Sequence, residues 1–232
     1  MTPTYLLLHG IGLSHRAFIG LEAHLSHHGR VINFDLPGFG STPRPSHRMS
    51  VEDYAATIRR ELHDRDAGPV VVVGHSMGAQ FAVELARQHP DAVTHVVLVG
   101  PVVDAKKRSL VAQSLALLRD SALEPPRTQF MVITDYLRCG PRWFLREVRS
   151  MLEYPTHIAI TDLTQPVLVL RGENDPIADA SWCESLRGRA ADGAVVTIAD
   201  NRHNVVHSDP SASAAAIIEF AAVIRPSGRS PR

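Results

Sequence analysis

Short apolar runs alternate along this chain with segments of helical periodicity. The runs are rich in Val, Leu and Ile, as expected of strands that are covered on both faces of a sheet. Six runs are predicted to be strands: Tyr5–Leu8, Val31–Phe34, Pro69–Val73, Val96–Val99, Val167–Leu170 and Ala194–Ile198. The pattern between and after them predicts helices over Ser14–His28, from Ser50 with Tyr54, Ile58 and Leu62 on one face, over Met77–His89, and over Pro210–Ile224. This alternation is typical of α/β architecture, with a mainly parallel sheet and helices on both faces.

Residues 104–163 interrupt the alternation, because they hold helical patterns but no strand of comparable strength. The helical patterns are Ser109–Arg119, Thr128–Arg138 and Arg142–Leu152. We interpret this insertion as a small helical lid rather than a separate domain. The expected organisation is a core formed by 1–103 and 164–225, a lid at 104–163 and a flexible tail at 226–232.

Composition narrows the range of partners. The chain has 232 residues, of which 44% are hydrophobic and 21% charged, which suits a globular protein with a sizeable core. It has 24 basic and 24 acidic residues, so no charge excess favours nucleic acid or an anionic membrane. Two cysteines, Cys139 and Cys183, are too few for a disulfide framework. We therefore expect a cytoplasmic protein that acts on a small molecule, without a metal, a cofactor, nucleic acid or a membrane partner.

The strongest motif is Gly74-His75-Ser76-Met77-Gly78, which fits G-x-S-x-G. It lies between the most continuous predicted strand and a predicted helix, the context in which this motif forms a sharp turn. Such a turn exposes the serine hydroxyl above the sheet and requires small residues on either side. The helix that begins behind the serine supplies a partial positive field for an oxyanion.

Four further segments occur in a fixed order around this motif: Leu7–Gly12, Asp35–Ser41, Gly172–Ile177 and Asn201–His203. Together with the G-x-S-x-G turn they resemble the α/β-hydrolase superfamily, in its serine esterase and carbon–carbon bond hydrolase branch. Asp35–Ser41 resembles the D-x-P-G-x-G-x-S segment of that branch. The resemblance runs from residue 5 to about residue 224 and leaves only the insertion without a clear counterpart.

The resemblance implies a role for each site residue. Ser76 would be the nucleophile, His203 the general base, and Asp175 the acid that orients the imidazole. The backbone N–H groups of Ile11 and Met77 would form the oxyanion hole. This set implies a serine hydrolase that cleaves a small carboxylic ester or thioester through an acyl-enzyme, and no cofactor.

Several residues compete with this assignment. Glu173 and Asp104 are rivals of Asp175 for the acid. His207 lies four residues after His203, and two histidines at that spacing on a helix can bind zinc, but the glutamate of the H-E-x-x-H motif is missing. His75 is expected to be structural, and His9 to shape the loop that carries Ile11. The aromatic residues of the insertion either line an acyl pocket or pack the lid helices: Tyr136, Trp143 and Phe144.

Other functions remain to be weighed. The same triad can serve a carbon–carbon bond hydrolase, a lyase or a cyclase. Gly10-Ile11-Gly12 followed by Asp35 imitates a dinucleotide-binding fingerprint of an NAD-dependent oxidoreductase, but His15 stands where the third glycine is needed. A non-catalytic binding protein on the same fold is the third alternative.

Two departures from the family pattern have consequences. The first loop begins at His9, so the N-terminal hairpin of the sheet is expected to be missing or shortened. One sheet edge would then be exposed, which favours a covering partner and leaves a homo-oligomer open. Arg202 also stands where the family commonly has glycine before the histidine.

Overall fold

A computed structural model describes residues 2–103 and 123–223 of the chain. Its described residues form one six-stranded sheet in the order β2-β1-β3-β4-β5-β6, with every neighbouring pair parallel. The strands are β1 (Thr4–Leu8), β2 (Arg30–Asn33), β3 (Val70–His75), β4 (Val93–Val99), β5 (Val167–Gly172) and β6 (Gly193–Ile198). All six predicted strands are present, and the α/β class with a parallel sheet is confirmed.

Alternate side chains of the strands enter two separate apolar layers. Leu6, Leu8 and Val72 belong to one layer, whereas Leu7 and Val73 belong to the other. Because successive residues of a strand point to opposite faces, a strand that is covered on both faces, such as β1 or β3, needs apolar side chains at successive positions. This explains why the strands appear in the sequence as continuous apolar runs.

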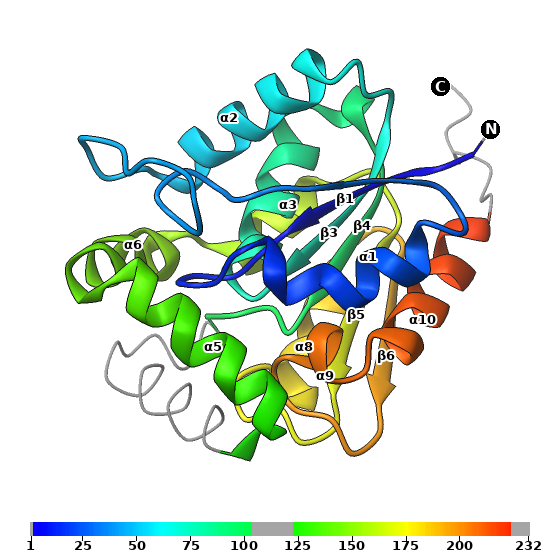
Figure 1. The fold of residues 1–232 in the computed structure, drawn as a ribbon. Helices are drawn as coiled ribbons and strands as arrows, with labels where there is room; N and C mark the ends of the chain where they lie inside the picture. The colour runs from blue at the N-terminus through cyan, green and yellow to red at the C-terminus, as the bar shows by residue number, and fades with distance from the viewer. Residues whose placement is uncertain (1, 104–122, 224–232) are drawn as a thin grey trace.

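Helices cover both faces of the sheet (Figure 1). On one face lie α1 (Ile19–Leu25), α9 (Val205–Ser208) and α10 (Pro210–Ala222). On the other face lie α2 (Val51–Asp64), α3 (Met77–Gln88) and α8 (Ala180–Arg187). The start of α2 is fixed by a capping box. Asp53 N–H donates to Ser50 Oγ at 3.1 Å, and Ser50 N–H donates to Asp53 Oδ2 at 2.9 Å.

The insertion contains helices in its described part, 123–163. These are α5 (Pro126–Cys139), α6 (Pro141–Glu153), the short α7 (Thr156–Ala159) and a 3₁₀ turn at Ile160–Asp162. The first two match the predicted helices there, whereas the predicted helix Ser109–Arg119 lies outside the described residues. Figure 1 shows α5 and α6 at the end of the sheet toward which the arrowheads of β1 and β3 point.

The strand order places the expected ligand-binding position at the same end of the sheet. From β1 the chain moves outward to β2, then returns past β1 to β3 and continues toward β6. In a parallel sheet, ligands bind outside the carboxyl ends of the strands at the point where the direction of progress reverses. That point lies between β1 and β3, which are followed by Gly10 and Ser76.

Some local expectations are corrected by the structure. The single helix predicted over Ser14–His28 is a 3₁₀ turn (His15–Phe18) followed by the shorter α1, because Phe18 adopts a non-helical conformation between them. Helix α8 was not predicted, although Asp179 caps it and Trp182, Cys183 and Leu186 form its buried face. Among the described residues, no helix is both long enough and apolar enough to cross a membrane.

Candidate active site

The G-x-S-x-G segment forms the sharp turn expected of it. Ser76 stands between the last residue of β3 and the first residue of α3, with φ 57° and ψ −119°. Positive φ is strained for a residue with a side chain, and its N–H is held by a 2.8 Å hydrogen bond to Val99 O. A Cβ atom on Gly74 would lie 2.2 Å from Gly78 O, and one on Gly78 would lie 2.0 Å from Leu8 O. Only glycine therefore fits two residues before and two residues after this serine.

The three residues predicted to form a triad meet through hydrogen bonds. His203 Nε2 lies 3.1 Å from Ser76 Oγ, and His203 Nδ1 lies 2.9 Å from Asp175 Oδ2. Because a carboxylate only accepts, Nδ1 carries the proton and Nε2 accepts from the serine hydroxyl. All three residues are buried, with exposed fractions of 2–3%. This geometry would allow an oriented imidazole to activate the serine hydroxyl.

Asp175 is held as a carboxylate. Its Oδ1 accepts hydrogen bonds from Ile177 N–H at 2.8 Å and Ala178 N–H at 3.0 Å. Burial alone would raise the pKa of Asp175, but the neighbouring His203 and these N–H donors lower that pKa below its usual value. The negative charge that would stabilise an imidazolium is therefore already in place.

Two glycines make room for this pair: Gly172, which opens the segment expected to carry the acid, and Gly100, which the sequence analysis did not single out. Gly100, directly after β4, has φ 52°, and a Cβ atom there would lie 3.0 Å from His203 Nδ1 and 3.3 Å from Asp175 Oδ2. A Cβ atom on Gly172 would lie 2.3 Å from Arg202 O. A glycine at the end of a buried strand was the available signal for both residues.

The rival residues lie elsewhere. Glu173 Oε2 accepts from Asp200 N–H at 3.1 Å, on the exposed side of the turn. His207 lies within α9, where its Nδ1 is 2.9 Å from Thr128 Oγ1. Asp104 lies outside the described residues. Of the candidate acids that the structure describes, Asp175 is the one that meets His203.

The loop after β1 contacts the serine. A Cβ atom on Gly10 would lie 2.9 Å from Ser76 Cβ, so the two chain segments are in direct contact. His9 fixes this loop, since its Nδ1 donates to Gly10 O at 2.9 Å and its Nε2 accepts from Leu36 N–H at 3.0 Å. Burial lowers the pKa of His9, which keeps the ring neutral, as this pair of bonds requires.

The two expected oxyanion donors flank this contact in sequence. Ile11 follows the glycine that touches Ser76, and Met77 follows Ser76 itself. Met77 is the first residue of α3, where an N–H has no partner within its own helix.

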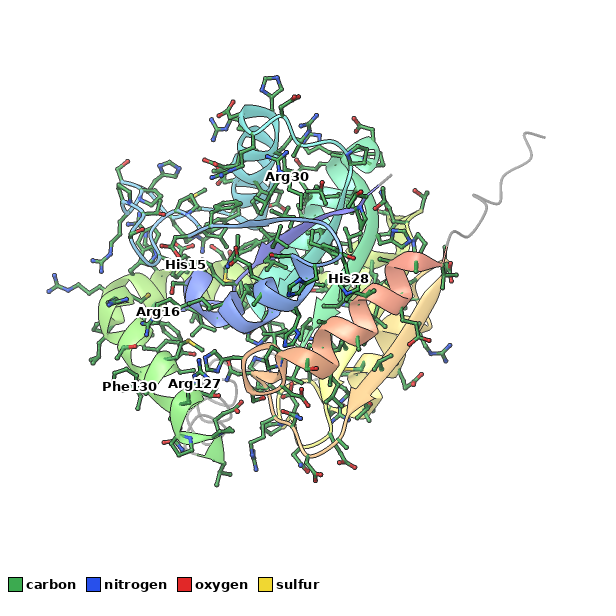
Figure 2. All side chains as sticks on the ribbon, turned by 45° about the vertical axis from the view of Figure 1, so that its right-hand side comes forward. His15, Arg16, His28, Arg30, Arg127 and Phe130 are labelled. Carbon is green, nitrogen blue, oxygen red and sulfur yellow. The ribbon has the colours of Figure 1, made fainter. Side chains whose placement is uncertain are left out.

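Helices α5 and α6 contact the segment that follows this loop. Asp135 accepts from Ser14 Oγ at 2.6 Å and from Arg16 Nη1 at 2.7 Å. Figure 2 shows His15 and Arg16 on the turn beside α5, which carries Arg127 and Phe130. The rings of Tyr136 and Phe144 lie 5.3 Å apart and pack on Gly12, where a Cβ atom would be 2.7 Å from Tyr136 and 3.2 Å from Phe144. These two aromatics therefore lie close to the expected oxyanion loop.

Trp143 and Asp35 have other neighbours. Trp143 packs on Gly38, in the loop after β2, and on Phe39. Asp35, which a dinucleotide site would place on a ribose, instead accepts from the N–H and Nδ1 of His15 and from the N–H and hydroxyl of Ser41. These bonds account for the low pKa of Asp35, about 2, although its partial burial acts in the opposite direction.

Known proteins that are similar to this chain identify its family. A family model described as "Alpha/beta hydrolase family" matches residues 5–216. The (E)-2-((N-methylformamido)methylene)succinate hydrolase of Acinetobacter baylyi is 25% identical, over 86% of this chain and 83% of that protein. The pimeloyl-[acyl-carrier protein] methyl ester esterase of Aromatoleum aromaticum is 27% identical, over 90% of this chain and 94% of that protein.

The fold is also shared with solved structures. A thermophilic esterase from Thermogutta terrifontis superposes with a TM-score of 0.81 at 21% identity, over 94% of this chain and 89% of that one. A sheet, a serine turn and a family match over most of the chain lead to the same conclusion. The chain belongs to the alpha/beta hydrolase family, and it is a hydrolase.

Proposed function

We propose that this hydrolase cleaves a small carboxylic ester or thioester through an acyl-enzyme formed on Ser76. The observation that carries the proposal is the continuous hydrogen-bonded series from Ser76 Oγ through His203 to Asp175, at 3.1 and 2.9 Å. Folding alone does not require these three side chains to converge. Their contact therefore weighs against a non-catalytic binding protein.

The proposed reaction has two halves. His203 Nε2 removes the hydroxyl proton as Ser76 Oγ attacks the substrate carbonyl carbon. The oxyanion that forms is stabilised by the N–H groups of Ile11 and Met77, and by the field at the start of α3. When the carbon–oxygen or carbon–sulfur bond breaks, His203 returns the proton to the departing alcohol or thiol. Water, deprotonated by His203, then attacks the acyl carbon. The bond between this carbon and Ser76 Oγ breaks as His203 returns the proton to Ser76 Oγ, and the carboxylic acid leaves.

The described surroundings favour an apolar acyl group. Tyr136 and Phe144 lie against Gly12, beside the proposed oxyanion loop. Met131 and Val132 of α5 pack with Leu13 in a small buried apolar cluster. We propose that α5 and α6, as part of a lid formed by 104–163 on a core of 1–103 and 164–225, cover the acyl group.

A test of the proposal uses p-nitrophenyl butyrate and a fluorophosphonate probe. Ser76→Ala is expected to lower kcat about 10³-fold or more and to abolish labelling, because the nucleophile is lost. Ser181→Ala, which removes an exposed hydroxyl from α8, is the matched control and should leave both unchanged. Activity should also fall below neutral pH, because a protonated imidazole cannot accept the serine proton. A folded wild-type protein that the probe does not label would contradict the proposal.

A second candidate keeps the triad and changes the bond that is cleaved. The segment Asp35–Ser41 resembles one shared with carbon–carbon bond hydrolases, and lyase or cyclase chemistry can start from the same residues. Product analysis with an ester and a dienone ring-fission compound, side by side, separates these activities. A cytoplasmic location and a homo-oligomer that covers an edge of the sheet stay predictions from the sequence.

A further inference from the structure

His75 is a buried polar residue that the proposed reaction does not use. It is the last residue of β3, directly before Ser76, and has an exposed fraction of 0%. Its Nε2 lies 3.0 Å from the main-chain oxygen of His203, and the two rings have centroids 5.0 Å apart. Because a carbonyl oxygen only accepts, Nε2 carries the proton and donates.

The protonation state of His75 follows from its surroundings. Burial, and then the neighbouring His203, lower the pKa of His75 to about 3, so the ring is neutral at physiological pH. With its proton on Nε2, Nδ1 is left as an acceptor. This buried atom has no hydrogen-bond partner in the part of the chain that the structure describes.

An unpaired buried acceptor costs stability, whereas an apolar ring of similar size would fill the same space without that cost. Packing alone therefore does not explain a histidine at this position. What an apolar ring cannot provide is the hydrogen bond to the main chain of His203.

That hydrogen bond links the two halves of the site. His203 lies on the loop between β6, which ends at Ile198, and α9, which begins at Val205. Other bonds tie this loop to the turn after β5, such as Asn174 N–H to Asn201 O at 2.8 Å. His75 instead ties it to β3, the strand that delivers Ser76.

The position of His75 in the strand explains how it reaches the loop. Its side chain follows Val71 and Val73 on the same face of β3, because residues two apart share a face. Val71 and Val73 belong to the apolar layer that also holds Val205 and Val206 of α9. His75 therefore continues this row at its carboxyl end, beneath the loop that carries His203.

We propose that His75 is a positioning residue that fixes the main chain of His203, and through it the imidazole, relative to Ser76. This inference rests on the proposed function. A misplacement of about 1 Å in a catalytic group can cost about 10²-fold in rate. The donor would therefore act on the rate of acylation rather than on substrate binding.

The test compares three variants with p-nitrophenyl butyrate and a fluorophosphonate probe. His75→Phe removes the donor and keeps a ring, His75→Leu removes both, and His75→Gln keeps an N–H donor on a flexible side chain. We expect His75→Phe and His75→Leu to lower kcat about 10- to 100-fold, with KM within about twofold of wild type. The probe should label them more slowly but to the same final stoichiometry. His75→Gln should have a kcat at least about fivefold higher than that of His75→Leu.

Stability is measured alongside activity to separate positioning from a structural role. His75→Phe removes the unpaired acceptor His75 Nδ1 but also the donor to the main-chain oxygen of His203, so we expect its melting temperature to stay close to that of wild type. His95→Phe is the matched control, since His95 is a partly buried histidine on the neighbouring β4 that packs edge-on to Phe220. This control should keep the wild-type kcat.

Two results would overturn the inference. One is a wild-type kcat in His75→Phe or His75→Leu. The other is equal activity in His75→Gln and His75→Leu, and this comparison stands even if His75→Phe does not fold. Ser76→Ala separates this failure from failure of the proposed function. If Ser76→Ala is inactive while His75→Phe is normal, only the positioning role is lost, whereas an active Ser76→Ala removes both.

Discussion

At the scale of single residues, the turn after β5 presents two carboxylates to different surroundings. Asp175 N–H donates to Gly172 O at 3.2 Å, which closes the turn directly after the strand. The turn directs the Asp175 carboxylate inward to His203 and leaves Glu173 on the outer side, bonded to Asp200 N–H. The position in the turn, two residues apart for Glu173 and Asp175, therefore decides which carboxylate is placed to orient the imidazole.

Asp175→Asn should lower kcat by about 10³- to 10⁴-fold with little change in fold. The amide cannot hold the imidazole in the required tautomer or stabilise its protonated form. The measurement is kcat for p-nitrophenyl butyrate, with circular dichroism to verify folding. Glu173→Gln is the matched control and should stay within about twofold of wild type. A large loss of activity in Glu173→Gln, with Asp175→Asn unaffected, would reverse the assignment.

At the scale of elements, α6 is attached to the core by a buried polar contact. Tyr54 Oη lies 3.1 Å from both Glu147 Oε2 and Pro37 O, so α6, α2 and the loop after β2 meet at one phenol. Glu147 has an exposed fraction of 0%. Burial raises the pKa of Glu147 to about 7, against smaller opposing effects that include the hydrogen bond with Tyr54. The packing of α6 on the core is therefore linked to the protonation of Glu147.

Glu147→Gln should remove part of the pH dependence of stability. In the unfolded chain the glutamate pKa is about 4.3. Between that pH and about 7 the folded protein holds an extra proton, so rising pH weakens folding across this interval. Glutamine is neutral throughout, and the variant should gain in melting temperature relative to wild type between pH 5 and pH 8.

The control for this prediction lies on the same helix. Glu153 is exposed and forms ion pairs with Arg48 and Arg149, which lower its pKa rather than raise it. Glu153→Gln should therefore show no relative gain as the pH rises. A constant difference in melting temperature between Glu147→Gln and wild type from pH 5 to pH 8 would refute the linkage.

At the scale of the whole molecule, the site is assembled at the carboxyl ends of the strands. Gly10, Ser76, Gly100, Asp175 and His203 follow β1, β3, β4, β5 and β6, respectively. Because the strands are parallel, all five chain segments leave the sheet at the same end. Residues up to 193 positions apart in the chain thus share one small volume, with the switch point between β1 and β3 at its centre.

This arrangement explains what the sequence could predict. Strands such as Val70–His75 and the serine turn are formed by residues that are neighbours in the chain. The sequence alone therefore predicts them. The contact of Ser14 with Asp135 spans 121 positions, and that of His75 with His203 spans 128. Neither leaves a periodic signal, because each depends on how distant loops are placed by the sheet. Helix α8 was missed for another reason. It has only eight residues, so its buried residues are too few to form a clear helical repeat in the sequence.

The sheet order also predicts how stability is distributed. β3 is buried at every position and paired on both sides, whereas β6 is mostly half-buried and, among the described strands, pairs only with β5. In native-state hydrogen exchange, amides of β3 should open only with global unfolding. Amides of β6 should exchange at least about tenfold faster, because an edge strand can open locally.

Mass spectrometry on peptic fragments would measure this difference at two protein concentrations. Fragments from β2, the other edge strand, are the internal comparison and should resemble β6 rather than β3. If β6 were as slow as β3 at both concentrations, the edge would not be a locally opening element and the prediction would be wrong. Protection of one edge that increases with concentration would instead indicate a second copy covering it, because an unpaired row of main-chain donors and acceptors favours such pairing.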